Sequence, residues 1–317
     1  MKNHIVVNRV EANHRAKIKK LFLGVQGTDG LIVKILIYAL LIGFGFVFLF
    51  PVLSMLSSSF QSITDLLNSG VIWIPTELYL DNYIRSLQVL NFWPVLLQTL
   101  LLSAVPAAIQ ALIASFVGYG FARFEFKGKK IMLGLVLMTF IVPPQVLLIP
   151  RYLLFHELGI LDSIMAYILP ATFGQGLQSA IFILIFYQTF KTIPTALEEA
   201  AQLDGAGFFK IFFKIAIPMG SAAYIISFLF SFVWYWNETQ LAAIYFSNIT
   251  TLPLQLQRFS AQFNMMFIQT GNAGSTNLNE GIEMAGTLLS ILPLLIIYFV
   301  LQRWFVESVD RSGITGE

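Results

Sequence analysis

The chain has 317 residues, of which 57% are hydrophobic and 11% are charged, with a formal net charge of +2. A soluble domain carries about 25% charged residues, so this composition excludes an ordinary soluble protein. The apolar residues form blocks long enough to cross about 30 Å of hydrocarbon as helices, and no stretch alternates like a barrel strand. The chain contains no Cys. We therefore expect an all-α integral membrane protein without thiolate sites.

A polar and basic segment, residues 1–30, precedes the first apolar block. It is longer and more charged than a signal peptide, and no small-residue cleavage site follows the block, so we interpret it as a cytoplasmic tail. Six predicted membrane spans follow in chain order: residues 31–55, 95–122, 131–155, 166–190, 221–246 and 284–305.

The segments between the spans complete the predicted organisation. Residues 56–94 and residues 247–283 form long extracytoplasmic loops. Residues 95–305 form a core of five spans that includes a cytoplasmic loop at 191–218, and residues 306–317 form a C-terminal tail.

The distribution of cations predicts the orientation. With the amino terminus in the cytoplasm, sixteen of the nineteen Lys and Arg residues lie inside, and Arg85, Arg151 and Arg258 lie outside. Because cytoplasmic segments are enriched in Lys and Arg, we expect both termini to be cytoplasmic.

Two features interrupt the predicted spans. Pro143 and Pro144 lack backbone N–H groups, so the third span should kink or unwind there, either as a gate hinge or as a simple change of shape. In the fifth span, the Trp-Tyr-Trp-Asn-Glu sequence at residues 234–238 leaves two possibilities open. The helix ends there at an aromatic belt, or it continues through a polar break.

The cytoplasmic loop between the fourth and fifth spans has the punctuation of a short helix. Thr192 or Thr195 can cap its start, and Glu198 and Glu199 follow in the first turns, where the helix dipole favours anions. Gly205 then allows the backbone to turn. A helix of about three turns is not stable alone, so it requires a partner. The alternative is an amphipathic connector without a partner.

The same loop resembles the EAA loop of ABC importer permeases. The shared positions, at the family's spacing, are Glu199, Ala200, Ala201, Gly205, Ile215 and Pro218. The chain departs only at Ile217, where the family usually has Leu. The longer pattern at residues 198–206, Glu-Glu-Ala-Ala-x-x-Asp-Gly-Ala, is similar to the carbohydrate, maltose-type branch. Further resemblance to that branch lies in residues 142–150, 236–238, 292–293 and 302–305.

This resemblance implies a type I ABC importer permease with six transmembrane helices in the bacterial cytoplasmic membrane. The solute would be a sugar, an oligosaccharide or a polyol. The implied partners are a second homologous permease, a cytoplasmic ABC ATPase dimer and an extracytoplasmic solute-binding protein, with no nucleic acid. ATP and Mg would bind to the ATPase, so this chain would carry no cofactor, metal or catalytic residue.

The resemblance also assigns roles within the loop, which would form a coupling helix docked on the ATPase. The expected coupling residues are Glu198, Glu199, Ala200, Ala201, Asp204 and Gly205. Glu199 would pair with the ATPase, while Ala200 and Ala201 would allow close packing. Gly205 would make the bend, and Asp204 would cap the second helix of the loop.

Polar residues within the spans are the candidates for a solute path or a gate, because lipid-facing polar groups are costly. They are Gln110, Gln178, Asn237 and Glu238. Gln110 belongs to a helical stripe of small and polar residues that either lines the path or packs helices together, with Thr99, Ser103 and Pro106.

Glu238 has two interpretations. It lies at membrane depth as a functional group, or at the outer interface beside Trp234 and Trp236.

Two other classes of protein remain as alternatives to the permease. A stand-alone ion-coupled secondary transporter would show more intramembrane acids or two related halves. A membrane-embedded enzyme would show paired carboxylates or a Ser-His arrangement at helical spacing. Neither pattern is visible, and no phosphate-binding Gly-x-x-x-x-Gly-Lys-[Ser/Thr] motif occurs.

Overall fold

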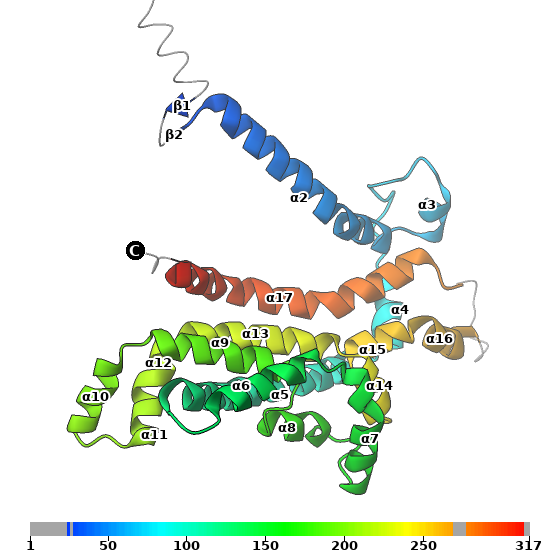
Figure 1. Ribbon diagram of the computed structural model, residues 1–317. Coiled ribbons are helices and arrows are strands. Elements are labelled where there is room, and N and C mark those ends of the chain that lie inside the picture. Colours follow the sequence, from blue (N-terminus) through cyan, green and yellow to red (C-terminus); the bar gives the residue numbers. More distant parts are fainter. Residues whose placement is uncertain (1–23, 26–27, 269–276, 314–317) are drawn as a thin grey trace, which may run out of the picture. The chain divides into compact units, whose positions relative to one another are not determined.

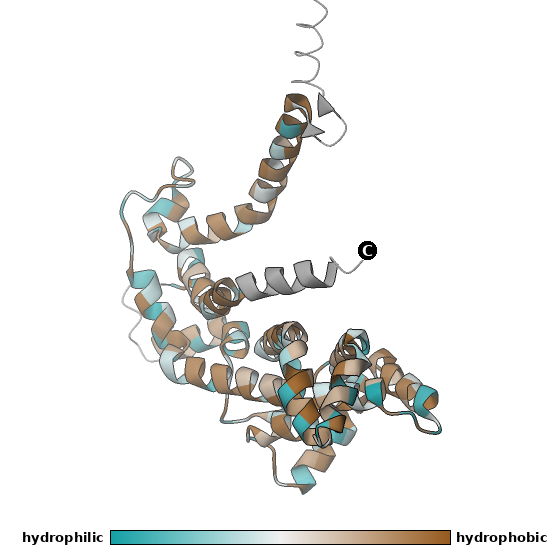
Figure 2. Cartoon of the chain, turned by 90° about the vertical axis from the view of Figure 1, so that its left-hand side faces the viewer, coloured by the Kyte–Doolittle hydropathy of each residue, from teal (hydrophilic) through white to brown (hydrophobic). Residues whose placement is uncertain are grey.

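The computed structural model describes residues 24–25, 28–268 and 277–313, with side chains for residues 30–267 and 277–302 (Figure 1). Within these residues the regular secondary structure is helical apart from two short strands, β1 (Gly24–Val25) and β2 (Thr28–Asp29), which pair antiparallel. The predicted all-α fold is confirmed. Hydrophobic residues predominate along the helices (Figure 2). Most of the tail predicted at residues 1–30 lies outside the described residues.

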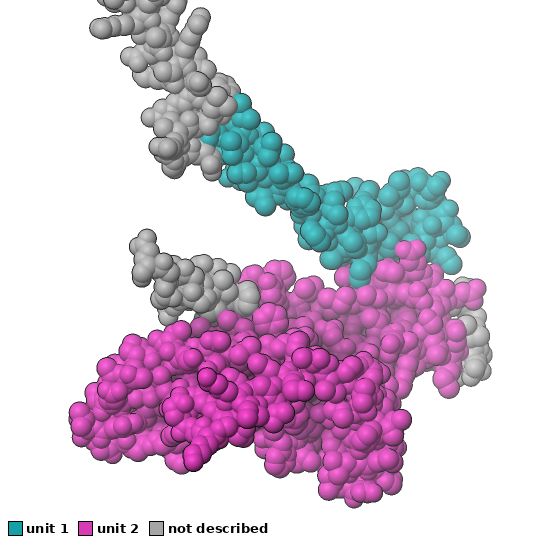
Figure 3. All heavy atoms as spheres, in the orientation of Figure 1, with its two compact units in different colours: residues 1–79 teal, residues 80–317 magenta. Residues whose placement is uncertain are grey.

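The chain divides into two compact units, residues 1–79 and residues 80–317 (Figure 3). The first unit contains α2 (Leu31–Ser59), whose large apolar side chains are exposed on all sides. A helix that is apolar all round belongs in a membrane, so α2 has the character expected of the first span.

The segment after α2 is held by its own hydrogen bonds. Its short helix, α3 (Ile63–Leu67), carries Asp65, whose carboxylate accepts the backbone N–H of Thr76 at 3.0 Å and its hydroxyl at 2.7 Å. The N–H of Tyr79 donates to the Phe60 carbonyl at 3.0 Å. The first predicted extracytoplasmic loop therefore begins as an ordered hairpin-like segment.

The second unit holds the other helices. In chain order they are α4 (Asp81–Val89), α5 (Phe92–Arg123), α6 (Lys129–Ile141), η1 (Pro144–Leu147), α7 (Leu148–Glu157), α8 (Met165–Thr172), α9 (Ser179–Thr192), α10 (Thr195–Leu203), α11 (Phe208–Ile211), η2 (Phe212–Ala216), α12 (Ile217–Met219), α13 (Ser221–Asn237), α14 (Gln240–Tyr245), α15 (Leu252–Gln257), α16 (Phe259–Phe263), η3 (Asn264–Ile268) and α17 (Glu280–Gly313).

Helix α5 is the centre of this unit. It packs along α9 and α13 and also contacts α8, while α17 contacts α4 and α13. The close approach of α5 to α9 depends on Gly118, because a Cβ there would lie 2.7 Å from the Cβ of Phe186 and 2.9 Å from the backbone nitrogen of Tyr187. Two buried apolar clusters result, one centred on Phe232 and Trp236 and the other on Phe186.

Three helices are individually long and apolar enough to cross a membrane: α2, α5 and residues 280–302 of α17. Three bent helix pairs pass the same test when each is taken together. Helices α6 and α7 with η1 bend by 93°, α9 and α10 by 73°, and the α11–α12 segment and α13 by 76°. Up to six spans therefore result among the described residues.

The bends show that three of the predicted spans are not continuous helices. The third predicted span does break at its two prolines, since α6 ends at Ile141 and Pro143 has an extended backbone. The fourth is divided into α8 and α9 by a turn with positive φ at Gly174 (69°) and Gln178 (56°). In the fifth, α13 ends at Asn237 and α14 begins at Gln240, so the helix is interrupted at Glu238 and Thr239.

Candidate functional site

The loop predicted to be cytoplasmic forms a short helix that ends in a glycine turn. Pro194 is the N-cap of α10 and no side chain caps this end, so the expected cap by Thr192 or Thr195 is wrong. At the other end Gly205 has φ of 77°. The N–H of Ala206 donates to the Ala201 carbonyl at 2.9 Å, and the Gly205 N–H donates to Gln202 at 2.9 Å. This is a Schellman motif, which requires the left-handed residue at Gly205.

Asp204 has a different role from the one expected. It is the C-cap of α10, whereas the N-cap of α11 is Gly207, with no side-chain hydrogen bond. The expectation that Asp204 caps the second helix of the loop is therefore wrong. The reason is geometric, because the turn at Gly205 places three residues, 205–207, between Asp204 and the start of α11 at Phe208.

The two adjacent glutamates of α10 lie in opposite environments. Glu198 is 7% exposed, and its Oε1 accepts a hydrogen bond from Nε of Arg123 at 2.7 Å. Glu199 and Ala200 are exposed, and Ala201 is half-buried. The predicted coupling residues therefore separate into an outward set, which includes Glu199, and one inward residue, Glu198.

The second half of the loop returns to the helix core. Phe208 and Phe212 contact the ring of Tyr119 on α5, and Phe212 is buried. The π-helical turn η2 lies just before Pro218, which has no N–H to donate to the preceding turn. The loop thus leaves the core through α10 and is anchored again through aromatic residues.

A closed ring of hydrogen bonds lies between α5, α13 and the break that separates α8 from α9. The Gln110 amide donates to the Leu177 carbonyl, the Leu177 N–H donates to the Tyr235 hydroxyl at 3.3 Å, and that hydroxyl donates to Gln110 Oε1 at 2.9 Å. Gly176 lies against this ring, because a Cβ there would be 2.3 Å from Gln110 Oε1. Gln110 therefore fixes the break in place and is 1% exposed.

The stripe that contains Gln110 is buried along its length. Thr99, Ser103 and Pro106 are all buried, and the Thr99 hydroxyl donates to the Val95 carbonyl at 2.6 Å while accepting the Leu252 N–H at 2.9 Å. Of the two interpretations left open, helix packing is the one that this conformation supports.

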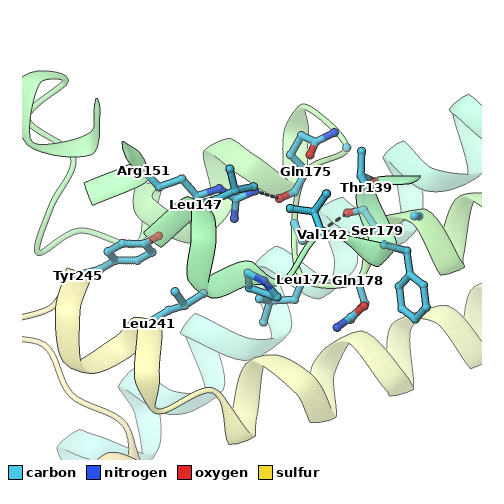
Figure 4. A pocket seen from close by; sticks show the side chains of 15 residues that line it. Thr139, Val142, Leu147, Arg151, Gln175, Leu177, Gln178, Ser179, Leu241 and Tyr245 are labelled. Carbon is cyan, nitrogen blue, oxygen red and sulfur yellow. Dashed lines mark hydrogen bonds between the residues drawn. The ribbon is translucent and has the colours of Figure 1, made fainter. Parts of the chain in front are cut away.

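Two neighbouring cavities lie where α6, α7, α9 and α13 approach the break. The first has a volume of about 250 Å³, and Figure 4 shows Arg151 and Tyr245 at one end and Thr139 and Ser179 at the other. The second has a volume of about 260 Å³. The two cavities share Pro144, Leu177, Gln178 and Leu241.

The predicted path residues are distributed unequally over these cavities. Gln178 lines both, and Asn237 and Glu238 line the second, together with Trp234. Glu238 Oε1 accepts the Leu241 N–H at 2.8 Å, so it also holds the start of α14. Gln110 lines neither cavity. Three of the four candidates therefore line one cavity.

The aromatic belt expected beside Glu238 is not formed by both tryptophans. Trp236 is 1% exposed and packs in the apolar cluster against Phe232, whereas Trp234 is half-buried. The two residues lie on different faces of α13, because they are two positions apart in a helix.

Sequence reasoning missed Asp162, which joins two loops. Its carboxylate accepts the backbone N–H groups of Ser247, Asn248 and Ile249 at 3.0, 2.9 and 3.1 Å, and its own N–H donates to Tyr245 at 2.8 Å. The backbone N–H of Asn248 is the main reason that the pKa of this carboxyl lies below its ordinary value. The available signal was a polar residue suited to left-handed backbone, here with φ of 57°, between two apolar runs.

The bent apolar helices, the exposed helical loop and the two cavities with amide side chains in their linings together define a multi-pass membrane transport protein. Residues 110–311 match the family described as binding-protein-dependent transport system inner membrane component. The chain belongs to this family of ABC transport permeases, and it is therefore a multi-pass component of the inner membrane.

Relatives cover nearly the whole chain. The polygalacturonan/rhamnogalacturonan transport system permease of Bacillus subtilis (strain 168) is 27% identical, covering 89% of this chain and 97% of the relative. The arabinooligosaccharides transport system permease of Halalkalibacterium halodurans is 29% identical, covering 89% of this chain and 98% of the relative. Both relatives are permeases, which favours the permease prediction over the ion-coupled transporter.

The fold has a solved counterpart. A chain from the crystal structure of a bacterial ABC transporter involved in the import of the acidic polysaccharide alginate matches with a TM-score of 0.73 and 24% sequence identity. The match covers 86% of this chain and 96% of that chain. The predicted ABC importer permease fold is confirmed.

Proposed function

We propose that this chain is one of two permeases that together form the membrane path of an importer for a carbohydrate. An extracytoplasmic binding protein would deliver the solute, and a cytoplasmic ATPase dimer, which carries the ATP and Mg, would drive transport. Both termini would then lie in the cytoplasm. The chain itself would contribute no catalytic residue, cofactor or metal site.

The observation that carries the solute class is the lining of the second cavity. Four amides, from Gln145, Gln178, Asn237 and Gln240, surround this space together with the ring of Trp234. Amides donate and accept hydrogen bonds at once, as the hydroxyls of a sugar require, and an aromatic ring supplies a flat apolar surface. The relatives named for polygalacturonan/rhamnogalacturonan and arabinooligosaccharides support the same class.

Helix α10 would carry the force from the ATPase. Its outward surface presents Glu199 for pairing and the small side chain of Ala200 for close approach. Leu203, 90% exposed, supplies an apolar anchor. Truncating a charge that becomes buried and paired at such an interface should cost about 2–5 kcal/mol.

Reconstitution tests the proposal. The tagged chain, purified in mild detergent, should retain a second permease and an ATPase, and the complex in liposomes with its binding protein should take up labelled oligosaccharide only with ATP. Uptake without ATP by the chain alone would instead establish a secondary transporter.

The cavity is tested by Gln145→Leu in the same liposomes. We expect the KM for uptake to rise several-fold, because the loss of one hydrogen bond weakens solute binding by roughly 1–2 kcal/mol. The matched control is Gln88→Leu, an exposed glutamine of α4 that lines neither cavity. Equal kinetics of the two variants would place the solute elsewhere.

A further inference from the structure

The polarity of α10 is reversed relative to an ordinary surface helix. Glu198 is its only fully buried residue, while Leu197 and Leu203 are 44% and 90% exposed. A surface helix normally buries its apolar residues and exposes its charges. The inward face of α10 is therefore held chiefly by one carboxylate rather than by apolar packing.

The partner of that carboxylate joins three elements. Arg123 is the last residue of α5, and its Nε donates to Glu198 of α10 at 2.7 Å. Its Nη2 donates to the carbonyl of Ile193, the C-cap of α9, at 2.8 Å. The side chains of Arg123 and Glu198 are only 11% and 9% exposed. A planar guanidinium can hold both acceptors at fixed angles, whereas a lysine ammonium cannot.

Helix α5 also links Arg123 to the break between α8 and α9. Helix α5 runs from Arg123 back to Gln110, about 20 Å along the helix axis, where Gln110 closes the hydrogen-bonded ring with Tyr235 and Leu177. Leu177 lines both cavities. A continuous chain of directional contacts therefore runs from α10 through α5 to the cavity wall.

We propose that the Arg123–Glu198 ion pair is the link that transmits movement of α10 to α5 and so couples ATP hydrolysis to opening of the path. This inference rests on the proposed function, since it assigns Arg123 and Glu198 as positioning residues within it. A buried ion pair adds little net stability compared with apolar packing, but its geometry is directional. A directional contact suits this place, because it would keep the angle between α10 and α5 fixed while α10 moves.

This assignment gives Glu198 and Glu199 different roles. Glu199 faces outward, where the ATPase would bind, and Glu198 faces inward, toward the permease itself. Loss of Glu199 should weaken retention of the ATPase. Loss of Glu198 should leave the docking surface in place and lower the amount of solute moved per ATP hydrolysed.

The test measures solute uptake and ATP hydrolysis together in liposomes that contain the complete complex. We expect Glu198→Gln to retain the ATPase on purification and to lower transport per ATP by roughly tenfold. The control is Glu125→Gln, which removes an exposed ion pair with Lys129, also 2.7 Å long, in the neighbouring cytoplasmic loop. This control should keep the wild-type ratio.

Charge exchange separates coupling from folding. We expect Arg123→Glu alone to lose coupled transport, and the double variant Arg123→Glu with Glu198→Arg to recover a substantial part of the transport per ATP. An unchanged ratio in Glu198→Gln, a loss of assembled complex in that variant, or a double variant no better than Arg123→Glu would each overturn the inference. Failure of the wild-type complex to couple uptake to ATP would instead overturn the proposed function.

Discussion

Left-handed residues mark several of the turning points of the permease. Gly205 closes α10, Gln178 precedes α9, and Asp162 joins the α7–α8 loop to the α14–α15 loop, each with positive φ. Side chains other than glycine adopt this conformation at a cost, so such positions are set by the fold and tolerate few substitutions. Single substitutions here should therefore have clear effects.

The turn after α10 provides a matched pair of glycines. Gly205 has φ of 77°, whereas Gly207, two residues later, has φ of −74°, and neither would bring a new Cβ within 4 Å of another atom. We expect Gly205→Ala to cost about 1–2 kcal/mol and to lower retention of the ATPase on purification, because only backbone strain is introduced. Gly207→Ala should behave as wild type. Equal retention in both variants would contradict the role of the turn.

Asp162 should make the stability of the two loops that it joins depend on pH. Because backbone donors lower the pKa of its carboxyl in the folded protein, its stabilising effect is present above the unfolded pKa of about 3.9 and is lost as pH falls through the folded value. We expect Asp162→Asn to melt below wild type at neutral pH, with the difference closing in acid. Scanning fluorimetry of the purified complex measures this.

The control for this experiment is Asp204→Asn, at an exposed carboxylate with no hydrogen-bond partner among the described side chains. Its melting curve should follow wild type at every pH. A gap between wild type and Asp162→Asn that persists unchanged in acid would show that the amide fails for a reason other than charge.

At this scale the sequence predicts residue types better than residue roles. The loop pattern correctly located Gly205 at the turn, because only a few residues adopt its backbone conformation. The same pattern grouped Glu198 with Glu199, although one is buried against Arg123 and the other is exposed. Adjacent helical positions differ by about 100° around the axis, so the partner on α5 decides between them.

At the scale of elements, the close contact between α5 and α9 allows a direct test of helix packing. Gly118 and Gly120 lie two residues apart on α5, and a Cβ at Gly118 would lie 2.9 Å from the Tyr187 backbone nitrogen, whereas a Cβ at Gly120 would meet nothing within 4 Å. Gly118→Ala should therefore destabilise the permease by about 1–3 kcal/mol.

Gly120→Ala is its internal control and should be neutral or slightly stabilising, since alanine favours a helix over glycine. Thermal unfolding of the two purified variants measures the difference. Identical melting temperatures would mean that the two helices separate easily, contrary to the geometry at Gly118.

Helix breaks were predictable only where their cause is local. Pro143 and Pro144 break the third block because they lack N–H groups, and this follows from the sequence. The break at residues 173–178 lies within a block that is apolar on average, and it is held open by Gln110 from another helix. A contact between distant segments leaves no mark in the hydropathy of either one.

At the scale of the whole molecule, the predicted orientation remains to be measured. With both termini in the cytoplasm, a fluorescent protein fused after residue 317 should fluoresce. Alkaline phosphatase inserted after Asn68, an exposed residue of the first loop predicted to be extracytoplasmic, should be active. The cation distribution is the physical reason for this expectation. Phosphatase activity from the C-terminal fusion would reverse the assignment.

The exposed leucines of α10 also affect how stable the permease is in the cell before it assembles. Leu197 and Leu203 are exposed, and under the proposed function they would face the aqueous cytoplasm until an ATPase covers them; exposed apolar surface of this kind favours aggregation. Permease molecules that have not assembled with an ATPase should therefore be degraded by cellular proteases. Degradation of the excess would in this way keep the subunits of the proposed transporter in balanced numbers.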